Sequence, residues 1–174
     1  MEQSAKDLLL SVWGETSHEL ARVVAAMGID LGEIDDVLQE VYMAAWQSPP
    51  PQADSAGMRR WLFRVTINRC HLEHRRGRRW RRTLAGLGQL WARPRRGDPA
   101  DAVSEAEERE LVRRALDRLD PRLRSVLVLR YFEGFDSKEI GAILQMPDAT
   151  VRSHLRTARN KLRWELKRAE YRHE

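Results

Sequence analysis

The chain of 174 residues is long enough for one domain or two small ones, and its hydrophobic content of 42% is sufficient for a helical core. The single cysteine, Cys70, excludes an internal disulfide framework and agrees with a reducing cytoplasm. The N-terminus has no basic leader or cleavage signature, and no stretch approaches the roughly 20 apolar residues of a membrane span. We therefore expect a cytoplasmic protein without membrane insertion.

Charge is distributed unevenly along the chain, whose formal net charge is +5. Residues 1–57 carry 2 basic and 10 acidic side chains, whereas residues 58–82 carry 10 arginines and one acid, Glu73. Residues 137–174 again have an excess of basic side chains, 9 against 5. Two basic segments set apart from an acidic N-terminal third predict a polyanion contacted at two places and a separate, basic partner for the acidic part.

The first half of the chain has helical periodicity and no alternating strand pattern. A first helix is predicted from Ala5 to Met27, and a second begins near Glu33 and ends before the three prolines at 49–51. We expect a polar loop from Pro49 to Gly57. A third helix is predicted to start near Met58 and to fade in the arginine run at 75–82. The residues spaced along one face of this predicted helix are Trp61, Leu62, Val65, Asn68 and Leu72.

The composition of residues 84–102 is that of a linker, which predicts a domain boundary there. After it, Ser104 and Glu107 resemble a capping box, and a helix follows as far as the Asp120-Pro121 stop. The next helix is predicted to run from Pro121 to Gly134. Two more are expected at 137–145 and from Thr150 to about Lys167.

The last two helices are predicted to form a helix-turn-helix, because apolar residues at helical spacing lie on both sides of the short MPDA turn. These are Ile140, Ile143 and Leu144 on one helix and Val151, Leu155 and Leu162 on the other. Thr150, or Asp148 before it, is expected to cap the second helix.

Packing of the apolar stripe would leave an arginine stripe exposed on the final helix. Arginine can donate two hydrogen bonds to guanine or grip a phosphate, and short hydroxyl side chains allow close approach. The alternative is an ordinary solvated helix surface. The candidate DNA-binding residues are Thr150, Arg152, Ser153, Arg156, Thr157, Arg159 and Arg163.

Three motifs in this order resemble the bacterial RNA polymerase sigma factors of the extracytoplasmic-function (ECF) group of the sigma-70 family. They are DDVLQEVYMAAW at 35–46, RRWLFRVTINRCHLEHRRGRR at 59–79, and the long stretch from ALDRLDPRLRSV to RTARNKLR at 115–163. The resemblance covers nearly the whole chain outside the linker. It implies an all-α fold of two small helical domains joined by a flexible linker, the C-terminal one a four-helix domain ending in the helix-turn-helix.

The resemblance also implies a division of labour between the domains. Residues 1–82 would be region 2, which docks on core RNA polymerase and recognises and melts the minus-ten element. Residues 83–103 would be the linker, and residues 104–174 would be region 4, which reads the minus-thirty-five element. The implied function is a transcription initiation factor that directs polymerase to specific promoters without catalysis of its own.

Specific residues follow from the same resemblance. The residues that match the family's acidic docking motif for the clamp coiled coil of the β′ subunit are Asp35, Asp36, Gln39 and Glu40. The candidate minus-ten contacts are Gln52, Arg60, Arg64, Asn68 and Arg75. Trp61 matches a core position. Gln52 departs from the family, which often has a base-stacking aromatic in this loop; stacking contributes about 1–3 kcal/mol. Further implied partners are the β flap and an anti-sigma factor.

Simpler interpretations remain for several of these residues. The four docking residues could form a solvated helix face, and Asn68 could be a half-buried residue bonded within its helix. Cys70 and His74 have a spacing that suits a shared metal ion, but two further ligands are not visible, so we expect no metal or other cofactor. No catalytic triad or phosphate-binding loop stands out, which argues against an enzyme. The competing functions are a helix-turn-helix regulator that does not join polymerase and an RNA-binding protein.

Overall fold

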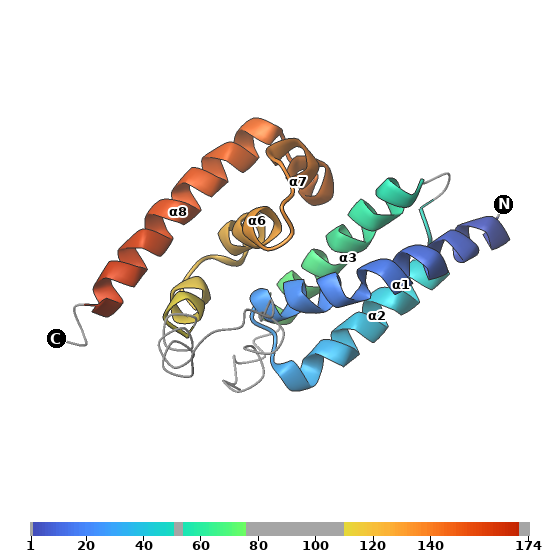
Figure 1. The fold of residues 1–174 in the computed structure, drawn as a ribbon, viewed down its shortest axis with the longest axis horizontal. Helices are drawn as coiled ribbons and strands as arrows, with labels where there is room; N and C mark the ends of the chain where they lie inside the picture. The colour runs from blue at the N-terminus through green and yellow to red at the C-terminus, as the bar shows by residue number, and fades with distance from the viewer. Residues whose placement is uncertain (1, 51–53, 76–109, 171–174) are drawn as a thin grey trace, which may run out of the picture.

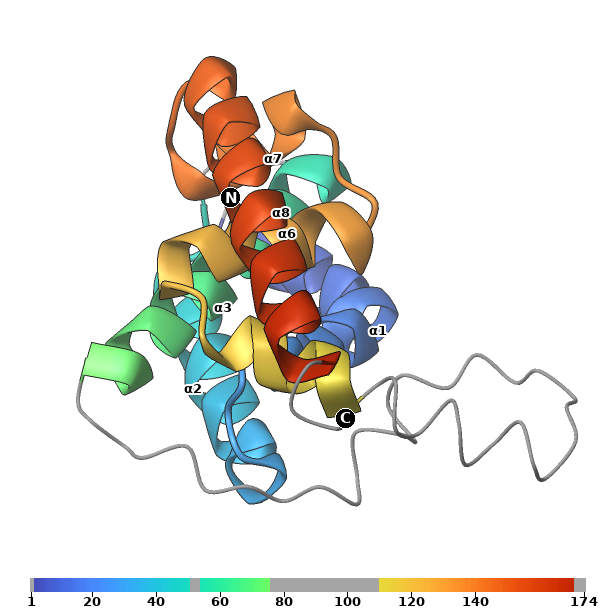
Figure 2. The ribbon, with the colours of Figure 1, turned by 90° about the vertical axis from the view of Figure 1, so that its left-hand side faces the viewer.

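A computed structural model describes residues 2–50, 54–75 and 110–170, and within these ranges every regular element is a helix. The predictions for Gln52, the arginine run after Arg75, the linker and the capping box at Ser104 lie outside the described residues. The helices form two groups that correspond to the two halves of the chain and pack against each other (Figure 1; Figure 2). The all-α, two-domain prediction is confirmed.

The first group consists of α1 (Glu2–Ala26), α2 (Ile34–Gln47) and α3 (Ser55–Arg75), each in contact with the other two. Gly28, whose φ is 86°, ends α1 in the left-handed conformation that glycine adopts without strain. A short 3-10 turn, η1 (Leu31–Glu33), then leads into α2. The buried apolar residues of the group include Leu9, Val12, Leu20, Val23, Val24, Ile34, Val37, Val41, Leu62 and Ile67.

The predicted start of the third helix and the predicted end of the loop before it are both wrong. The helix begins at Ser55 rather than near Met58, because the Asp54 side chain accepts a 2.6 Å hydrogen bond from the backbone N–H of Gly57 and so caps it early. The loop that was expected from Pro49 to Gly57 is shorter by the same amount.

The buried face of α3 also differs from the predicted one. It consists of Met58, Leu62, Phe63, Thr66, Ile67, Cys70 and Glu73. Of the five predicted face residues, only Leu62 is fully buried; Trp61, Val65 and Leu72 are half-buried and Asn68 is exposed. The helix α3 contacts α1 and α2 as well as the second group, so its apolar residues are distributed around the helix. The spacing of apolar residues in the sequence therefore does not identify a single buried face.

The second group consists of the helical residues 110–117, α6 (Pro121–Tyr131), α7 (Ser137–Leu144) and α8 (Asp148–Glu170). Asp120 caps α6 by accepting a 2.9 Å hydrogen bond from the N–H of Arg122, with Pro121 in the first turn as predicted. Residues 123–129 of α6 are all buried, because α6 lies between α8 and the first group. Figure 1 shows α8 on the outside of the molecule, with α6 between it and the first group.

An aromatic contact joins the two groups near the start of α3. The rings of Phe63 and Phe135 meet edge to face with centroids 5.0 Å apart. The Arg59 guanidinium lies 4.9 Å from the first ring and 4.8 Å from the second, and it forms a 2.8 Å ion pair with Glu19 on α1. Arg59 thus has structural partners on α1, on its own helix and in the segment between α6 and α7, so it belongs to the contact between the groups rather than to a free basic surface.

A second part of this contact contains buried charge. Arg124 on α6 has a side chain that is 1% exposed, and it donates from Nε to the backbone oxygen of Ala26 at the end of α1. Its Nη1 is 3.0 Å from Asp117, but burial outweighs that attraction and lowers the pKa of Arg124 to about 10. Glu133 is equally buried and pairs with Arg22 of α1 at 3.2 Å; burial raises the pKa of this carboxyl.

Candidate nucleic-acid interface

The helix-turn-helix is built from α7, a tight turn and α8. Asp136 caps α7 in a reciprocal capping box with Glu139, and Gln145 ends the helix in the left-handed conformation with φ 55°. The N–H of Met146 donates to the oxygen of Gly141 at 3.0 Å. A Cβ atom at position 141 would lie 2.7 Å from the Met146 backbone oxygen, so the close approach of turn and helix requires glycine there.

The apolar packing within this motif agrees with the prediction. Ile140 and Ile143 on α7 are fully buried, as is Val151 on α8, and Leu155 is 7% exposed. Leu144 and Leu162 are half-buried against the same core. The helix begins at Asp148, two residues before the predicted start at Thr150. The two helices share one apolar core on either side of a short turn, which orients the first turns of α8 relative to α7.

The predicted DNA-binding residues on α8 lie on its outer side. Six of them are exposed and Thr150 is half-buried; the exposed residues are Arg152, Ser153, Arg156, Thr157, Arg159 and Arg163. Arg152 forms a 2.5 Å ion pair with Asp148, and this pairing lowers the pKa of the Asp148 carboxyl. The stripe thus has both the base-reading residue types and the exposure that contact with a nucleic acid requires.

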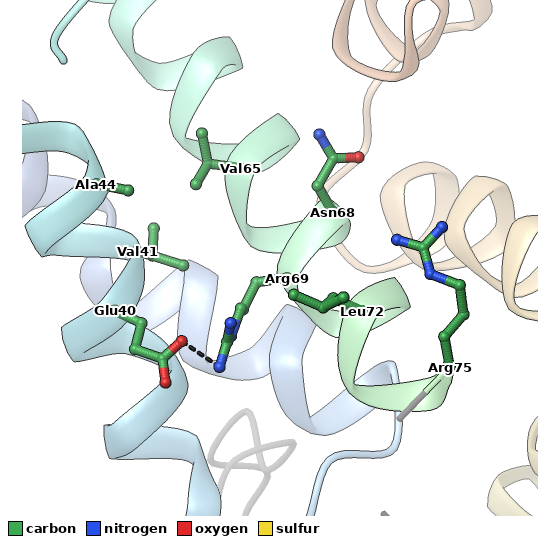
Figure 3. Close-up of a pocket in the computed structure, with 8 residues that line it drawn as sticks. All are labelled: Glu40, Val41, Ala44, Val65, Asn68, Arg69, Leu72 and Arg75. Atoms are coloured by element: carbon green, nitrogen blue, oxygen red, sulfur yellow. Dashed lines mark ion pairs between the residues drawn. The ribbon is translucent and has the colours of Figure 1, made fainter. Parts of the chain in front are cut away.

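The predicted residues of α3 share a second surface. Asn68 and Arg75 are exposed, and Arg60 and Arg64 are half-buried on the same side of the helix. Figure 3 shows Asn68 and Arg75 pointing away from α2. The exposure of Asn68 argues against the alternative of a half-buried residue bonded within its helix, and it leaves the amide accessible to a ligand.

The four predicted docking residues, Asp35, Asp36, Gln39 and Glu40, are all exposed on α2. Asp35 and Asp36 lie in the first turn, where a negative charge is stabilised by the helix dipole. Met43 continues the same face one turn further along and is 51% exposed. The opposite side of α2 packs into the core through Ile34, Val37, Val41 and Ala45. This face offers negative charge with an apolar side chain beside it, a combination suited to a basic protein partner.

A pocket of about 360 Å³ lies between α2 and α3 (Figure 3). Its lining comprises Glu40, Val41, Ala44, Val65, Asn68, Arg69, Leu72 and Arg75. Arg69 extends toward α2 and pairs with Glu40 and, at 2.8 Å, with Glu73. This residue connects the acidic face of α2 to the polar face of α3, and sequence reasoning missed it because nothing in the motif spacing distinguishes it from its neighbouring arginines.

The CHLEH segment has a structural role in place of the metal site that its spacing suggested. Cys70 is fully buried, and burial raises the pKa of its thiol to about 12. His74 donates from Nε2 to the backbone oxygen of Met27 at 2.9 Å. His71 lies 2.7 Å from Ser125 Oγ on α6. Burial lowers the pKa of both imidazoles, so both are held mainly in the neutral form at neutral pH.

No helix of the described part of the chain has both the length and the apolar character that crossing a membrane demands.

Comparison with known proteins finds a matching family for each half of the chain. The family model for sigma-70 region 2 matches residues 14–81, and the model for sigma-70 region 4 matches residues 109–162. The ECF RNA polymerase sigma factor SigL of Mycobacterium tuberculosis is 31% identical over 157 residues, covering 90% of this chain and 87% of SigL. The sigma factor CnrH of Cupriavidus metallidurans is 31% identical over 150 residues, covering 82% of this chain and 78% of CnrH.

Solved structures agree on the fold. The structure of CnrH in complex with the cytosolic domain of CnrY aligns with a TM-score of 0.67 and 24% identity, covering 95% of this chain and 96% of that one. The sigma factor RpoE of Bartonella quintana, solved with the anti-sigma factor NepR, aligns with a TM-score of 0.59 and 21% identity, covering 96% and 98%. The sequence matches cover both helical groups, and the chain belongs to the ECF group of RNA polymerase sigma factors.

Proposed function

We propose that this protein binds core RNA polymerase and directs it to specific promoters, without catalysing a reaction itself. In the proposed complex, the acidic face of α2 contacts the clamp coiled coil of the β′ subunit, and residues 104–174 form a second contact with the β flap. The first turns of α8 enter the major groove at the minus-thirty-five element. Residues 1–82, through α3 and the loop that contains Gln52, recognise and melt the minus-ten element, with residues 83–103 as the linker.

The observation that carries this proposal is the presence of two chemically opposite exposed surfaces in one small chain. On α8, Arg152, Ser153 and Arg156 lie exposed at the start of the second helix of a helix-turn-helix. This is the part of such a motif that reaches base edges. On α2, Asp36 and Glu40 lie exposed on a face that a nucleic acid would repel. A protein that connects DNA to a basic protein partner needs both surfaces.

Within the α8 surface, position along the helix suggests different roles. Arg152, Ser153 and Arg156 lie nearest the N-terminus and are proposed to contact base edges. Arg159 and Arg163 lie one and two turns further on, where a helix leaves the groove, and are proposed to contact phosphates. A base contact supplies sequence discrimination of about 1–3 kcal/mol, whereas a phosphate contact supplies affinity on every sequence.

The competing function is that of a helix-turn-helix regulator that binds DNA without joining polymerase. Such a protein needs the α8 surface but has no use for an exposed acidic face on a separate helical group. Incubation of the purified chain with core polymerase and a library of promoter fragments distinguishes the two. We expect core binding and initiated transcripts from a subset of fragments. Fragment binding without core binding or initiation would support the regulator.

A pair of variants tests the docking face directly. Asp36→Asn combined with Glu40→Gln is expected to weaken core binding at least tenfold, because both substitutions remove exposed negative charge from the proposed contact. Glu15→Gln removes an exposed negative charge from α1 and serves as the matched control. Equal effects of the two changes would show that α2 is not the docking site.

An anti-sigma factor is a further proposed partner. The related CnrH was solved with the cytosolic domain of CnrY, and RpoE with NepR. For this chain we propose a partner that covers the acidic face of α2. A protein encoded beside this gene, with a small cytoplasmic domain, is the candidate to test: the purified domain should abolish initiation and compete with core for the wild-type chain. The proposed function places the protein in the cytoplasm, where polymerase acts.

A further inference from the structure

Most arginines that have no carboxylate partner in the described part of the chain lie on the two proposed DNA surfaces. These are Arg60, Arg64 and Arg75 on α3 and Arg156, Arg159 and Arg163 on α8. Elsewhere, Arg130 donates to the backbone oxygen of Phe135, and Arg168 lies over the ring of Trp164. The guanidinium of Arg122, on α6, is exposed and has no hydrogen bond, ion pair or ring contact among the described residues. These contacts therefore give Arg122 no structural role.

The contact between His71 and α6 brings Arg122 close to the α3 surface. His71 Nε2 lies 2.7 Å from Ser125 Oγ and 3.3 Å from the backbone oxygen of Pro121. Arg122 directly follows Pro121, and Arg75 follows His71 by about one helical turn. Burial lowers the pKa of His71, and the positive charges of Arg122 and Arg75 lower it further. The two arginines, one from each helical group, are thus neighbours of the same imidazole.

The α3 surface leads toward this point. Arg64, Asn68 and Arg75 are separated by four and seven residues, a spacing that places them along one side of a helix. Figure 3 shows Asn68 and Arg75 on the side of α3 away from α2, and α3 also contacts α6 and α7. Asp120 is a carboxylate near the same place, and its Oδ1 accepts a hydrogen bond from the backbone N–H of Arg122. Two guanidinium groups against one carboxylate leave the site positively charged.

We propose that Arg122 continues the DNA surface of α3 onto the second group, so that the free protein binds the backbone of one DNA strand across both groups. Exposed arginines without a carboxylate partner are suited to phosphates. A single strand is favoured over a duplex because it can bend from α3 to α6, whereas duplex DNA is stiff over about 150 base pairs. Continuity with the proposed minus-ten surface favours DNA over an acidic protein. The inference rests on the proposed function and adds a contact to it.

The expected size of the effect follows from the release of counterions. Each phosphate contact on a single strand contributes about 0.7 to the slope of log affinity against log salt concentration. If the Arg122 contact contributes nothing at about 1 M salt, its loss weakens binding about 8-fold at 50 mM and about 3-fold at 200 mM. A change in folding stability alone does not lower this slope, so the slope identifies a phosphate contact.

The primary test is fluorescence anisotropy of a labelled 20-nucleotide oligo-dT with the purified full chain. All proteins share a background without the unpaired arginines of α8, which would compete for the strand: Arg156→Ala, Arg159→Ala and Arg163→Ala. Arg122→Gln should lower the salt slope by about 0.7, whereas Arg118→Gln should leave it unchanged. Arg118 is a matched control because it is an exposed arginine four residues earlier that already pairs with Glu165 at 3.0 Å. Equal losses would mean a general charge effect and would overturn the inference.

A conservative variant separates a charge contact from a structural role. Arg122→Lys should keep most of the salt slope, because lysine also binds phosphate as a point charge. Arg122→Gln should melt at the same temperature as the background protein. A slope as low in Arg122→Lys as in Arg122→Gln, or a clear loss of melting temperature in Arg122→Gln, would indicate a structural role and would overturn the inference.

A double variant tests whether one strand meets both groups. Arg75→Gln/Arg122→Gln should lower the slope by about 1.4, and the background protein should bind one strand per chain at saturation. Two strands per chain would mean separate sites on the two groups and would overturn the inference. A polyglutamate peptide serves as a competitor. If Arg122→Gln weakens binding of this peptide more than binding of oligo-dT, the preferred partner is an acidic protein and the assignment to DNA is wrong.

The two levels of the proposal fail in different ways. If the wild-type chain does not bind core polymerase, the proposed function is refuted, while the effect of Arg122→Gln on oligo-dT binding is still measured. If the wild type binds core and initiates, but Arg122→Gln and Arg118→Gln bind oligo-dT alike, only the role of Arg122 is refuted.

Discussion

Arg124 and Asp117 form an ion pair, but we expect substitution of the two residues to have very different effects on stability. Arg124 is 1% exposed, whereas Asp117 is 24% exposed and has a second partner in Arg113 at 2.8 Å. If Arg124 is removed, Asp117 still pairs with Arg113. If Asp117 is removed, the buried guanidinium of Arg124 loses a neighbouring negative charge. We expect Asp117→Asn to destabilise the protein strongly and Arg124→Met to be nearly neutral.

The magnitudes follow from burial. Burial lowers the pKa of Arg124 to about 10 in the folded protein, so the charged form is disfavoured there by about 3 kcal/mol relative to an exposed arginine, even with Asp117 present. Methionine avoids this cost, although its side chain is shorter. It loses the hydrogen bond to the Ala26 oxygen, which is worth about 1–3 kcal/mol if the oxygen stays unsatisfied, and the pair with Asp117, which keeps Arg113 as a partner. Asp117→Asn keeps Arg124 buried and removes the negative charge of Asp117 beside it, for which the cost is about 3 kcal/mol.

Thermal unfolding followed by circular dichroism measures both variants. A loss of 3 kcal/mol in a chain of this length corresponds to a melting temperature lower by about 6–12 °C, whereas Arg124→Met should stay within about 4 °C of the wild type. The order of the two variants is the decisive result. If Arg124→Met unfolds at a temperature as low as Asp117→Asn, the ion pair is a net stabilising interaction and the reasoning from burial is wrong.

Three further predictions concern the turn, the pH dependence and the DNA contacts. Gly141→Ala should cost about 1–3 kcal/mol because its Cβ would meet the Met146 backbone oxygen at 2.7 Å, whereas Gly14→Ala, in open space on α1, should gain up to about 1 kcal/mol; equal melting temperatures would contradict this. Burial lowers the pKa of His71, so the stability from its contact with α6 is fully present above the unperturbed value of about 6.5 and is lost as the pH falls below it. The melting temperature of the wild type should therefore fall more between pH 7.5 and 5.5 than that of His71→Gln. An equal fall in both proteins would show that the contact of His71 with α6 does not cause the pH dependence. Arg152→Ala and Arg156→Ala should each weaken recognition of an upstream element by about 5- to 150-fold without changing core binding, as measured by gel shift and by core titration; a loss of core binding as well as of DNA recognition would indicate a structural role.

The order of the helices in the described part of the second half, and their ends to within about three residues, could be predicted because the signals are local. The Asp120-Pro121 stop, Gly134 with its φ of 76° and the MPDA turn each determine the backbone through one or two residues. The alternation of apolar and arginine residues on α8 then fixed which side faces the core. The exposure of the predicted α8 residues follows from the same pattern.

The orientation of α3 could not be predicted in this way, because it depends on contacts from distant parts of the chain. Phe63 is buried against Phe135, 72 positions later in the sequence, and Arg59 is held between these rings and Glu19. Glu73 is buried with Arg69, a pairing that reads from sequence as two ordinary surface charges four residues apart. Periodicity describes one helix at a time, so it does not contain this information.

A partner that binds only when the two helical groups are separated has to break the contact between them, and this costs free energy. Such a partner binds only the fraction of molecules in which the contact is broken, and its apparent affinity falls in proportion to that fraction. A contact worth about 2 kcal/mol would weaken apparent binding roughly 30-fold. The edge-to-face rings of Phe63 and Phe135 and the Arg22–Glu133 pair would thereby set a threshold concentration of partner. Substitutions in this contact would shift that threshold without changing the surfaces proposed to bind DNA or polymerase.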